Sequence, residues 1–173
     1  MKHNNIHIRA IEPGDIDFLY ACENDPDVWH VSNTHLPFSK HILRRYIEHA
    51  QEDIFLAGQV RFIIADNENN SPCGMLDFFD FDPFHRRAGI GIIICKEKRN
   101  KGYAKEALSL GINYAFEYLN LHQLFCNISA SNNASRHLFE SAGFKQCGIK
   151  KDWLIRKAGF EDELMYQLIN PAE

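Results

Sequence analysis

The amino-acid sequence predicts an α/β fold in which a mixed, mostly antiparallel central sheet of about seven strands carries helices on both faces. Apolar residues alternate or cluster in several short segments, which is typical of strands. Between them they recur every three or four positions, which is typical of helices. The segments follow one another as strand, two helices, three strands, helix, strand, helix and two strands. Three strands in a row favour an antiparallel meander, and the strand–helix–strand unit after it makes the sheet mixed.

Length and composition narrow the class of protein. The 173 residues are the size of one ordinary domain, so residues 1–173 are expected to form a single unit. A content of 45% hydrophobic and 24% charged residues is typical of a soluble globular chain. The formal net charge of -4 disfavours a nucleic-acid partner, because phosphate binding needs a basic surface. The opening MKHNNIHIRA has no signal-peptide core and no run is long enough to span a bilayer, so we expect a cytoplasmic protein without a membrane partner.

The cysteines and histidines do not form a ligand pattern. The five cysteines are far apart and form no CxxC pair, and the nine histidines show no HExxH spacing. Neither a disulfide framework nor a metal site is therefore expected.

The first half of the chain predicts one strand followed by two helices. Residues 6–11 alternate, which favours a strand, and Pro13 is suited to open the helix that follows. That helix is expected to have Ile16, Leu19 and Tyr20 on one face. Ser39 is a good N-cap for the second helix, whose apolar stripe is formed by Ile42, Leu43, Tyr46, Ile47 and Ala50.

The remaining elements follow from the same periodicities. Strands are expected around Val60–Ile64, over 73–81 and over 86–95, with the polar run 66–72 as a hairpin loop. A helix after Gly102 is predicted from apolar residues at every fourth position, namely Ala104, Leu108, Ile112 and Phe116. A strand over 122–129, a helix over 133–142 and strands over 144–156 and 161–169 complete the chain.

The segment Lys96–Lys105 combines three features of a phosphate site. It is rich in lysine and arginine although the chain is acidic overall. Gly102 stands where the loop becomes helix, and a glycine there lets the backbone approach a ligand. The first N–H groups of a helix have no partner within it and favour anions. The segment matches neither the GxxxxGK[ST] nor the GxGxxG pattern, so nucleotide hydrolysis and hydride transfer are poorly supported. A solvated basic loop is the alternative interpretation.

Two motifs resemble those of the GNAT N-acetyltransferase superfamily. Residues 99–104, RNKGYA, are similar to its (Q/R)xxGx(G/A) signature, which holds the pyrophosphate of acetyl-CoA. Residues 132–144, NNASRHLFESAGF, resemble its last helix, with the pattern N…S…LYE(K/S)xGF. The bacterial spermidine/diamine acetyltransferase branch is the most similar, through residues 85–88, 92–94 and 120–122. The order of strands and helices also fits the fold of this superfamily.

The resemblance implies a binding site for acetyl-CoA. In the family, the strand before the pyrophosphate loop diverges from the next parallel strand, and pantetheine lies in the gap. The three isoleucines of that strand also suit a buried core, and the two interpretations are compatible. The implied coenzyme-binding residues are Ile92, Ile93, Ile94, Arg99, Asn100, Lys101, Gly102, Tyr103, Ala104, Lys105, Asn132, Ser135 and Phe139.

The candidate catalytic groups are carboxylates, a histidine and a serine. Asp77 and Asp80 lie on the strand beside the expected acceptor cleft and are candidate bases, as is His85; each carboxylate could equally be a surface group. The family's usual acid is a tyrosine, but Phe139 stands at that position and has no proton to give. A thiolate leaves near neutral pH without full protonation, since a thiol has a pKa of roughly 8.5. Ser135 is a candidate substitute acid, or else it binds coenzyme or caps the helix.

These features predict transfer of an acetyl group from acetyl-CoA to a primary amine of a small molecule, by direct attack in a ternary complex. The alternatives are an acetyltransferase for protein or peptide amino termini and a non-catalytic acetyl-CoA-binding module. Where polyamine enzymes are expected to carry acidic residues, this chain has His35, Leu36 and Gly89. A polyamine-like amine is therefore retained without a commitment to spermidine. The resemblance also makes a homo-oligomer plausible.

Overall fold

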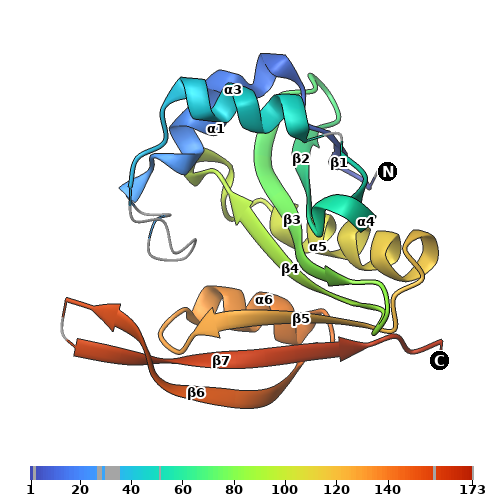
Figure 1. The fold of residues 1–173 in the computed structure, drawn as a ribbon, viewed down its shortest axis with the longest axis vertical. Coiled ribbons are helices and arrows are strands. Elements are labelled where there is room, and N and C mark those ends of the chain that lie inside the picture. The colour runs from blue at the N-terminus through green and yellow to red at the C-terminus, as the bar shows by residue number, and fades with distance from the viewer. Residues whose placement is uncertain (2, 27–28, 30–35, 51, 158, 173) are drawn as a thin grey trace.

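A computed structural model describes residues 1, 3–26, 29, 36–50, 52–157 and 159–172. It confirms the predicted α/β class, with one seven-stranded sheet in the order β1-β2-β3-β4-β5-β7-β6 and helices on both faces (Figure 1). The strands are β1 (Ile6–Ala10), β2 (Val60–Asp66), β3 (Pro72–Asp82), β4 (Arg87–Ile94), β5 (Gln123–Ser129), β6 (Lys145–Arg156) and β7 (Gly159–Ile169). The helices are α1 (Ile16–Glu23), α3 (Lys40–His49), α4 (Ile54–Ala57), α5 (Tyr103–Asn113) and α6 (Asn133–Ser141).

The sheet is divided between β4 and β5. All neighbouring strands pair antiparallel except these two, which run parallel. Their pairing is confined to Arg87–Gly89 opposite Gln123–Phe125. Beyond that point the strands separate, so that β1 to β4 and β5 to β7 form two halves of an open sheet (Figure 1). This divergence agrees with the expectation from the family resemblance.

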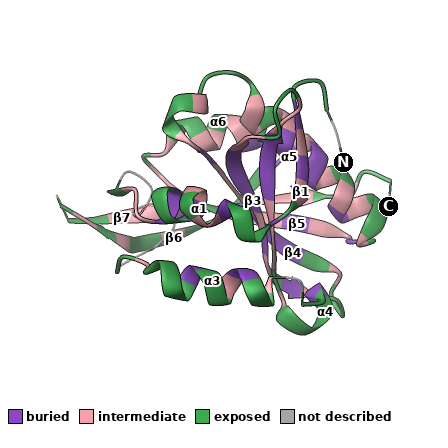
Figure 2. Cartoon of the chain, turned by 90° about the horizontal axis from the view of Figure 1, so that it is seen from above, coloured by how far each residue is buried: buried purple, intermediate pink, exposed green. Residues whose placement is uncertain are grey.

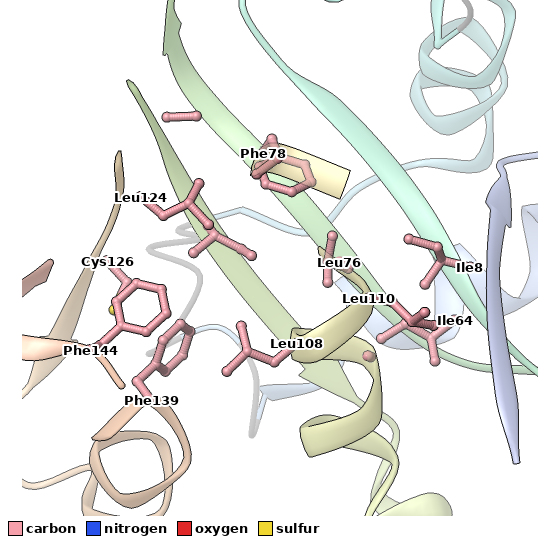
Figure 3. Packing of buried hydrophobic residues seen from close by; sticks show 14 of the residues in the cluster. Ile8, Ile64, Leu76, Phe78, Leu108, Leu110, Leu124, Cys126, Phe139 and Phe144 are labelled. Carbon is pink, nitrogen blue, oxygen red and sulfur yellow. The ribbon is translucent and has the colours of Figure 1, made fainter. Parts of the chain in front are cut away.

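Alternation along the strands separates the core into two clusters. In β2, Ile64 packs with Leu76 and Leu108 under α5, whereas Ile63 belongs to a cluster with α1 and α3. The larger cluster extends through Leu124, Cys126 and Phe144 to α6 (Figure 3). Figure 2 shows the buried strands between helices whose outer faces are exposed. Among the described residues, every helix is too short or too polar to cross a bilayer.

Two glycines set the spacing around β3. A Cβ on Gly111 of α5 would lie 2.8 Å from a Leu76 methyl and 3.1 Å from one of Ile90, so the glycine lets the helix approach the sheet closely. A Cβ on Gly74 would lie 2.2 Å from the carbonyl oxygen of Ile93. The second contact is with backbone, so β3 and β4 can keep this distance only with glycine at position 74.

Several local expectations are corrected. Tyr20 is not buried with Leu19: it is 40% exposed, and the ammonium of Lys40 lies over its ring. Ile42 is likewise 47% exposed, because Leu43 and Ile47 make the inner face of α3. The helix after Gly102 ends its regular α-helical part at Asn113 and continues as a π-helical turn over Tyr114–Tyr118. Helix α4, with its Asp53 cap and left-handed Gly58, was not predicted.

Candidate active site

A cavity of about 690 Å³ opens where β4 and β5 separate. Its walls come from the end of β4, the basic loop, the first turn of α5, the connection after β5, and α6. It brings together most of the residues expected to bind coenzyme. The lining residues are Ile92, Ile93, Ile94, Lys98, Arg99, Asn100, Gly102, Tyr103, Ala104, Lys105, Ser129, Ser131, Asn132, Ala134, Ser135, His137, Leu138, Ser141 and Arg156.

Gly102 shapes the mouth of this cavity. Its φ of +81° lies in the left-handed region, and a Cβ built on it would meet no atom within 4 Å. The carbonyl of Gly102 accepts the first helical hydrogen bonds of α5, from the amides of Lys105 and Glu106. The amides of Tyr103 and Ala104 precede these bonds and sit at the positive end of the helix dipole. The backbone here is therefore open to an anion.

The cavity is strongly cationic. Lys98, Arg99, Lys105 and Arg156 line it, and none of the lining residues that the structure describes is acidic. Arg99 is fixed at the edge of the cavity because its Nε donates to the carbonyl of Ile94 at 3.0 Å. Such a concentration of positive charge in a chain of net charge -4 fits a ligand that carries several phosphates.

Helix α6 supplies the opposite wall. The side chain of Asn132 caps it by accepting a hydrogen bond from the amide of Ser135 at 3.1 Å. Ser135 is half-buried and belongs to the lining. Ala134, Leu138 and Ser141 line the same wall although they were not predicted. Their spacing of four and three residues is that of one helix face, so helical periodicity was the signal that would have found them.

Glu161 of β7 ties three parts of the cavity together. Its Oε1 accepts hydrogen bonds from the Ser129 hydroxyl at 2.7 Å and the Ser131 amide at 2.6 Å. Its Oε2 accepts from Arg156 Nε at 2.8 Å. Hydrogen bonds from Ser131 and Ser129, aided by Arg156, lower the pKa of Glu161 to about 2. The carboxylate therefore stays charged at neutral pH and holds Arg156 against the cavity.

Phe139 and Lys101 do not line the cavity as expected. Phe139 is only 4% exposed, and its ring packs edge-on against Phe144 at 5.0 Å in the core (Figure 3). Its neighbour Leu138 contributes to the cavity wall instead. Lys101 is exposed on the loop beyond the lining residues. The structure thus assigns Phe139 to packing, which explains why an apolar ring is accommodated there.

The three candidate bases lie outside this cavity. Both Asp77 oxygens accept from Arg61, at 2.7 and 2.8 Å, and the same guanidinium contacts the carboxylate of Glu23. Asp80 is exposed and lines a second cavity of about 780 Å³, together with Asp82, Arg87 and residues of β5 and β7. His85 is exposed in the β3–β4 turn, where its amide donates to Asp82.

The positions that lack expected acidic residues also differ in their surroundings. Leu36 is 77% exposed. Gly89 is covered by the ring of Phe79, which a Cβ would approach to 2.3 Å. Phe79 in turn packs edge-on against Phe125 across the sheet at 5.9 Å. His35 lies outside the described residues. In the described part of the chain, no group of three or more His, Cys, Asp or Glu side chains is arranged to hold a metal ion.

The match to a protein family decides the identity of this fold. A family model described as "Acetyltransferase (GNAT) domain" matches residues 5–145. The chain belongs to the GNAT acetyltransferases. The spermidine N(1)-acetyltransferase of Vibrio cholerae is 26% identical to this acetyltransferase over 148 residues, covering 84% of this chain and 82% of the relative. An uncharacterized N-acetyltransferase, p20, of Bacillus licheniformis is 30% identical over 163 residues, covering 94% and 91%.

Solved structures give the same result. A crystal structure of spermidine N-acetyltransferase from Vibrio cholerae, in complex with CoA and spermine, superposes with a TM-score of 0.85 at 24% identity. It covers 95% of each chain. The crystal structure of a probable acetyltransferase also gives a TM-score of 0.85, at 27% identity, over 96% of this chain and 94% of the other. The fold of this acetyltransferase is thus that of CoA-binding members of its family.

Proposed function

We propose that this acetyltransferase transfers the acetyl group of acetyl-CoA to a primary amine of a small molecule, by direct attack in a ternary complex. The observation that carries the proposal is the cationic cavity that opens into the gap between β4 and β5. A multiply charged, elongated coenzyme fits such a cavity in two ways. Its phosphates would lie at the basic mouth of the cavity, and its pantetheine arm would lie along the edge of β4. The crystal structure of the Vibrio cholerae relative with CoA supports this assignment.

Each part of the cavity has a separate role in binding. The open amides at the start of α5, with Lys98, Arg99 and Lys105, would bind the pyrophosphate. The backbone of Ile92–Ile94 faces a gap without a strand partner from β5 and would bond the amide groups of pantetheine. Asn132 and Ser135, at the start of α6, would close the other side of the coenzyme.

The chemistry makes modest demands on the protein. Acetyl-CoA supplies an activated thioester, so the chain must hold the amine in line, accept its proton and polarise the carbonyl. A backbone N–H of β4 near Ile92 is suited to the carbonyl. The leaving thiolate is stable near neutral pH, because a thiol has a pKa of roughly 8.5. The absence of a hydroxyl at Phe139 is therefore compatible with turnover, with Ser135 as the remaining candidate acid.

For the base, Asp80 is the better of the two carboxylates. Asp77 is engaged by Arg61 through both oxygens, so its carboxylate is already occupied by another donor. Asp80 is exposed and lines the second cavity. The variants Asp80→Asn and Asp77→Asn separate these roles. Loss of turnover in Asp80→Asn with unchanged coenzyme affinity supports Asp80, whereas an active Asp80→Asn enzyme with normal pH dependence rules it out.

The acceptor follows from relatives and from local charge. Relatives named spermidine N(1)-acetyltransferase support a polyamine-like amine. The carboxylates of Glu23 and Asp77 would attract a polycation, but Arg61 offsets one of their two negative charges. This weakens the attraction for a highly charged amine. Leu36 and Gly89 add no acidic group. An amine with few positive charges is therefore favoured over spermine-like substrates.

A thiol-release assay tests the proposal. Purified protein is given acetyl-CoA and a panel of polyamines, amino acids, aminoglycosides and peptides, and free CoA-SH is measured. Release with small amines is the expected result. Release with peptide amino termini alone would select the protein-acetylating alternative. Coenzyme binding by calorimetry without release in any mixture would select the non-catalytic acetyl-CoA-binding module.

A further inference from the structure

Two cysteines distant in sequence meet beside the coenzyme cavity. Cys22 is in the last turn of α1, and Cys95 directly follows β4. Their Sγ atoms are 3.1 Å apart across a sequence separation of 73 residues. Cys22 is 9% exposed and Cys95 is partly exposed, so Cys95 is the more accessible member of the pair. The acetyl-transfer reaction uses neither thiol.

The pair is chemically asymmetric. A hydrogen bond from the Cys22 thiol lowers the pKa of Cys95, and the same contact raises the pKa of Cys22. The charge of Arg99 favours the Cys95 thiolate, while Glu97 and partial burial oppose it. On the side of Cys22, the nearby carboxylates are Glu23 and Asp25. Thiolate character and access together mark reactive cysteines, so Cys95 is the more reactive member of the pair.

The backbone around Cys95 is well held. Its amide donates to the carbonyl of Cys73 on β3 at 2.9 Å. The Cys73 thiol is itself fully buried and directed to the carbonyl of Ser71 at 3.5 Å. The Cys73 thiol is therefore near Cys95 in the fold but closed to solvent. This leaves Cys22 as the partner for Cys95.

We propose that Cys22 and Cys95 are a peroxide-sensitive modification site that closes to a disulfide. The Cys95 thiolate attacks one oxygen of hydrogen peroxide and the O–O bond breaks. The leaving hydroxide takes up the proton that the Cys95 thiol had released, so a sulfenic acid and one water result. The Cys22 sulfur then attacks the Cys95 sulfur, so that the S–S bond forms and the S–O bond breaks, and the leaving hydroxide takes the Cys22 proton to become the second water. Two thiols lose two electrons and two protons, and one peroxide is reduced to two waters.

The disulfide would join the two sides of the active-site region. Cys95 is adjacent to Ile94, which lines the coenzyme cavity. Cys22 precedes Glu23, which contacts Arg61 beneath Asp77. An S–S bond of about 2.05 Å brings the two Sγ atoms roughly 1 Å closer than their reduced separation of 3.1 Å. The disulfide would therefore tie the residue next to the cavity-lining Ile94 to the end of α1.

Mass spectrometry of the full chain tests this site. The protein is first reduced, and the added reductant is then removed. It is treated with a small excess of hydrogen peroxide, quenched and alkylated. We expect a mass loss of about 2 Da before alkylation, two fewer alkylated cysteines than in the reduced protein, a cross-linked Cys22–Cys95 peptide, and reversal by dithiothreitol. In Cys22→Ser, dimedone should trap a sulfenic acid at Cys95. In Cys95→Ser, peroxide consumption should fall by about tenfold or more.

Cys147→Ser is the matched control, because this exposed cysteine lies on β6 away from the pair. It should leave the cross-link unchanged. Cross-links that join other cysteines, or a wild-type sulfenic acid at Cys95 that never condenses, would overturn the proposal. If a serine variant fails to fold, the wild-type cross-link map alone decides the result.

Discussion

Gly102 joins the basic loop to α5 in a backbone conformation that few residues adopt. Its φ is +81°, and the space where a side chain would project contains no protein atom within 4 Å. Asparagine and aspartate tolerate left-handed backbone better than other non-glycine residues. The site therefore permits a pair of substitutions that differ mainly in charge.

Gly102→Asp is expected to weaken acetyl-CoA binding by at least about tenfold, since it places a negative charge where phosphates bind. Gly102→Asn is the matched control, with nearly the same shape and no charge. Calorimetry on both folded variants measures the difference. Equal affinity of the two variants would show that the pyrophosphate does not sit at this loop.

Ser135→Ala addresses the second residue-scale question, whether the hydroxyl binds coenzyme or donates a proton. Because the Ser135 amide is already bonded to Asn132, loss of the hydroxyl should leave α6 capped. We expect KM for acetyl-CoA to rise by about threefold or more, with kcat within about twofold, as for one lost hydrogen bond. Ser109→Ala on α5 is the control, since Ser109 is not among the residues that line the cavity. A large fall in kcat at unchanged KM would instead identify Ser135 as the acid.

At the scale of elements, Glu161 connects β7, the end of β6 and the connection that follows β5. Its pKa of about 2 lies below the value of about 4.3 for an unfolded glutamate. A depressed pKa means that the charged network stabilises the fold above the unfolded pKa. This contribution is lost as pH falls toward 2.

Glu161→Gln should therefore lower the urea midpoint of unfolding at pH 6, where the carboxylate is fully charged. At about pH 3.5 the difference from wild type should narrow, because wild type has by then lost part of the contribution. Urea titrations at the two pH values, followed by circular dichroism, measure it. A constant difference across this range would contradict the role given to the charge.

Elements with a clear period were predictable from the sequence, and elements without one were not. The stripe from Ala104 to Ile112 predicted α5, but the same spacing at Phe116 could not reveal the π-helical turn. That turn depends on hydrogen bonds such as Leu119 N–H to the Tyr114 carbonyl. Helix α4 is four residues long, which is too short to show a periodicity. Its only sequence signals are the N-cap residue Asp53 and the C-cap residue Gly58.

The candidate site divides in the same way. Most of the motif residues predicted to bind coenzyme, including Arg99, Gly102 and Ser135, line the cavity, because each motif is local in sequence. Arg156 was missed because it reaches the cavity from a hairpin far along the chain, held there by Glu161. Phe139 was misplaced because a motif fixes a position in a helix and not the direction of its side chain.

At the scale of the whole molecule, two halves of a sheet are joined by three parallel residue pairs between β4 and β5. The larger core cluster nevertheless runs through both halves, from Ile64 to Phe144. A shared core favours one cooperative unit over two independent ones. This is the structural argument for treating residues 1–173 as a single domain.

Buried cysteines on each side of the division test that expectation. Cys73 on β3 is fully buried and Cys126 on β5 is 3% exposed. Pulsed thiol labelling across a urea titration, with each site assigned by mass spectrometry, should give the same midpoint for both. Distinct midpoints for Cys73 and Cys126 would show that the halves unfold separately.

The separation of β4 from β5 also predicts two different rates of amide hydrogen exchange within β4. Amides of Ile92–Ile94 that do not face β3 have no strand opposite them from β5. Their protons should exchange with deuterium far faster than those of residues 87–89, which pair with β5. A coenzyme that bonds this edge would slow exchange there and leave β1 unaffected. The ligand then completes the sheet in the literal sense, as the missing neighbour of a strand.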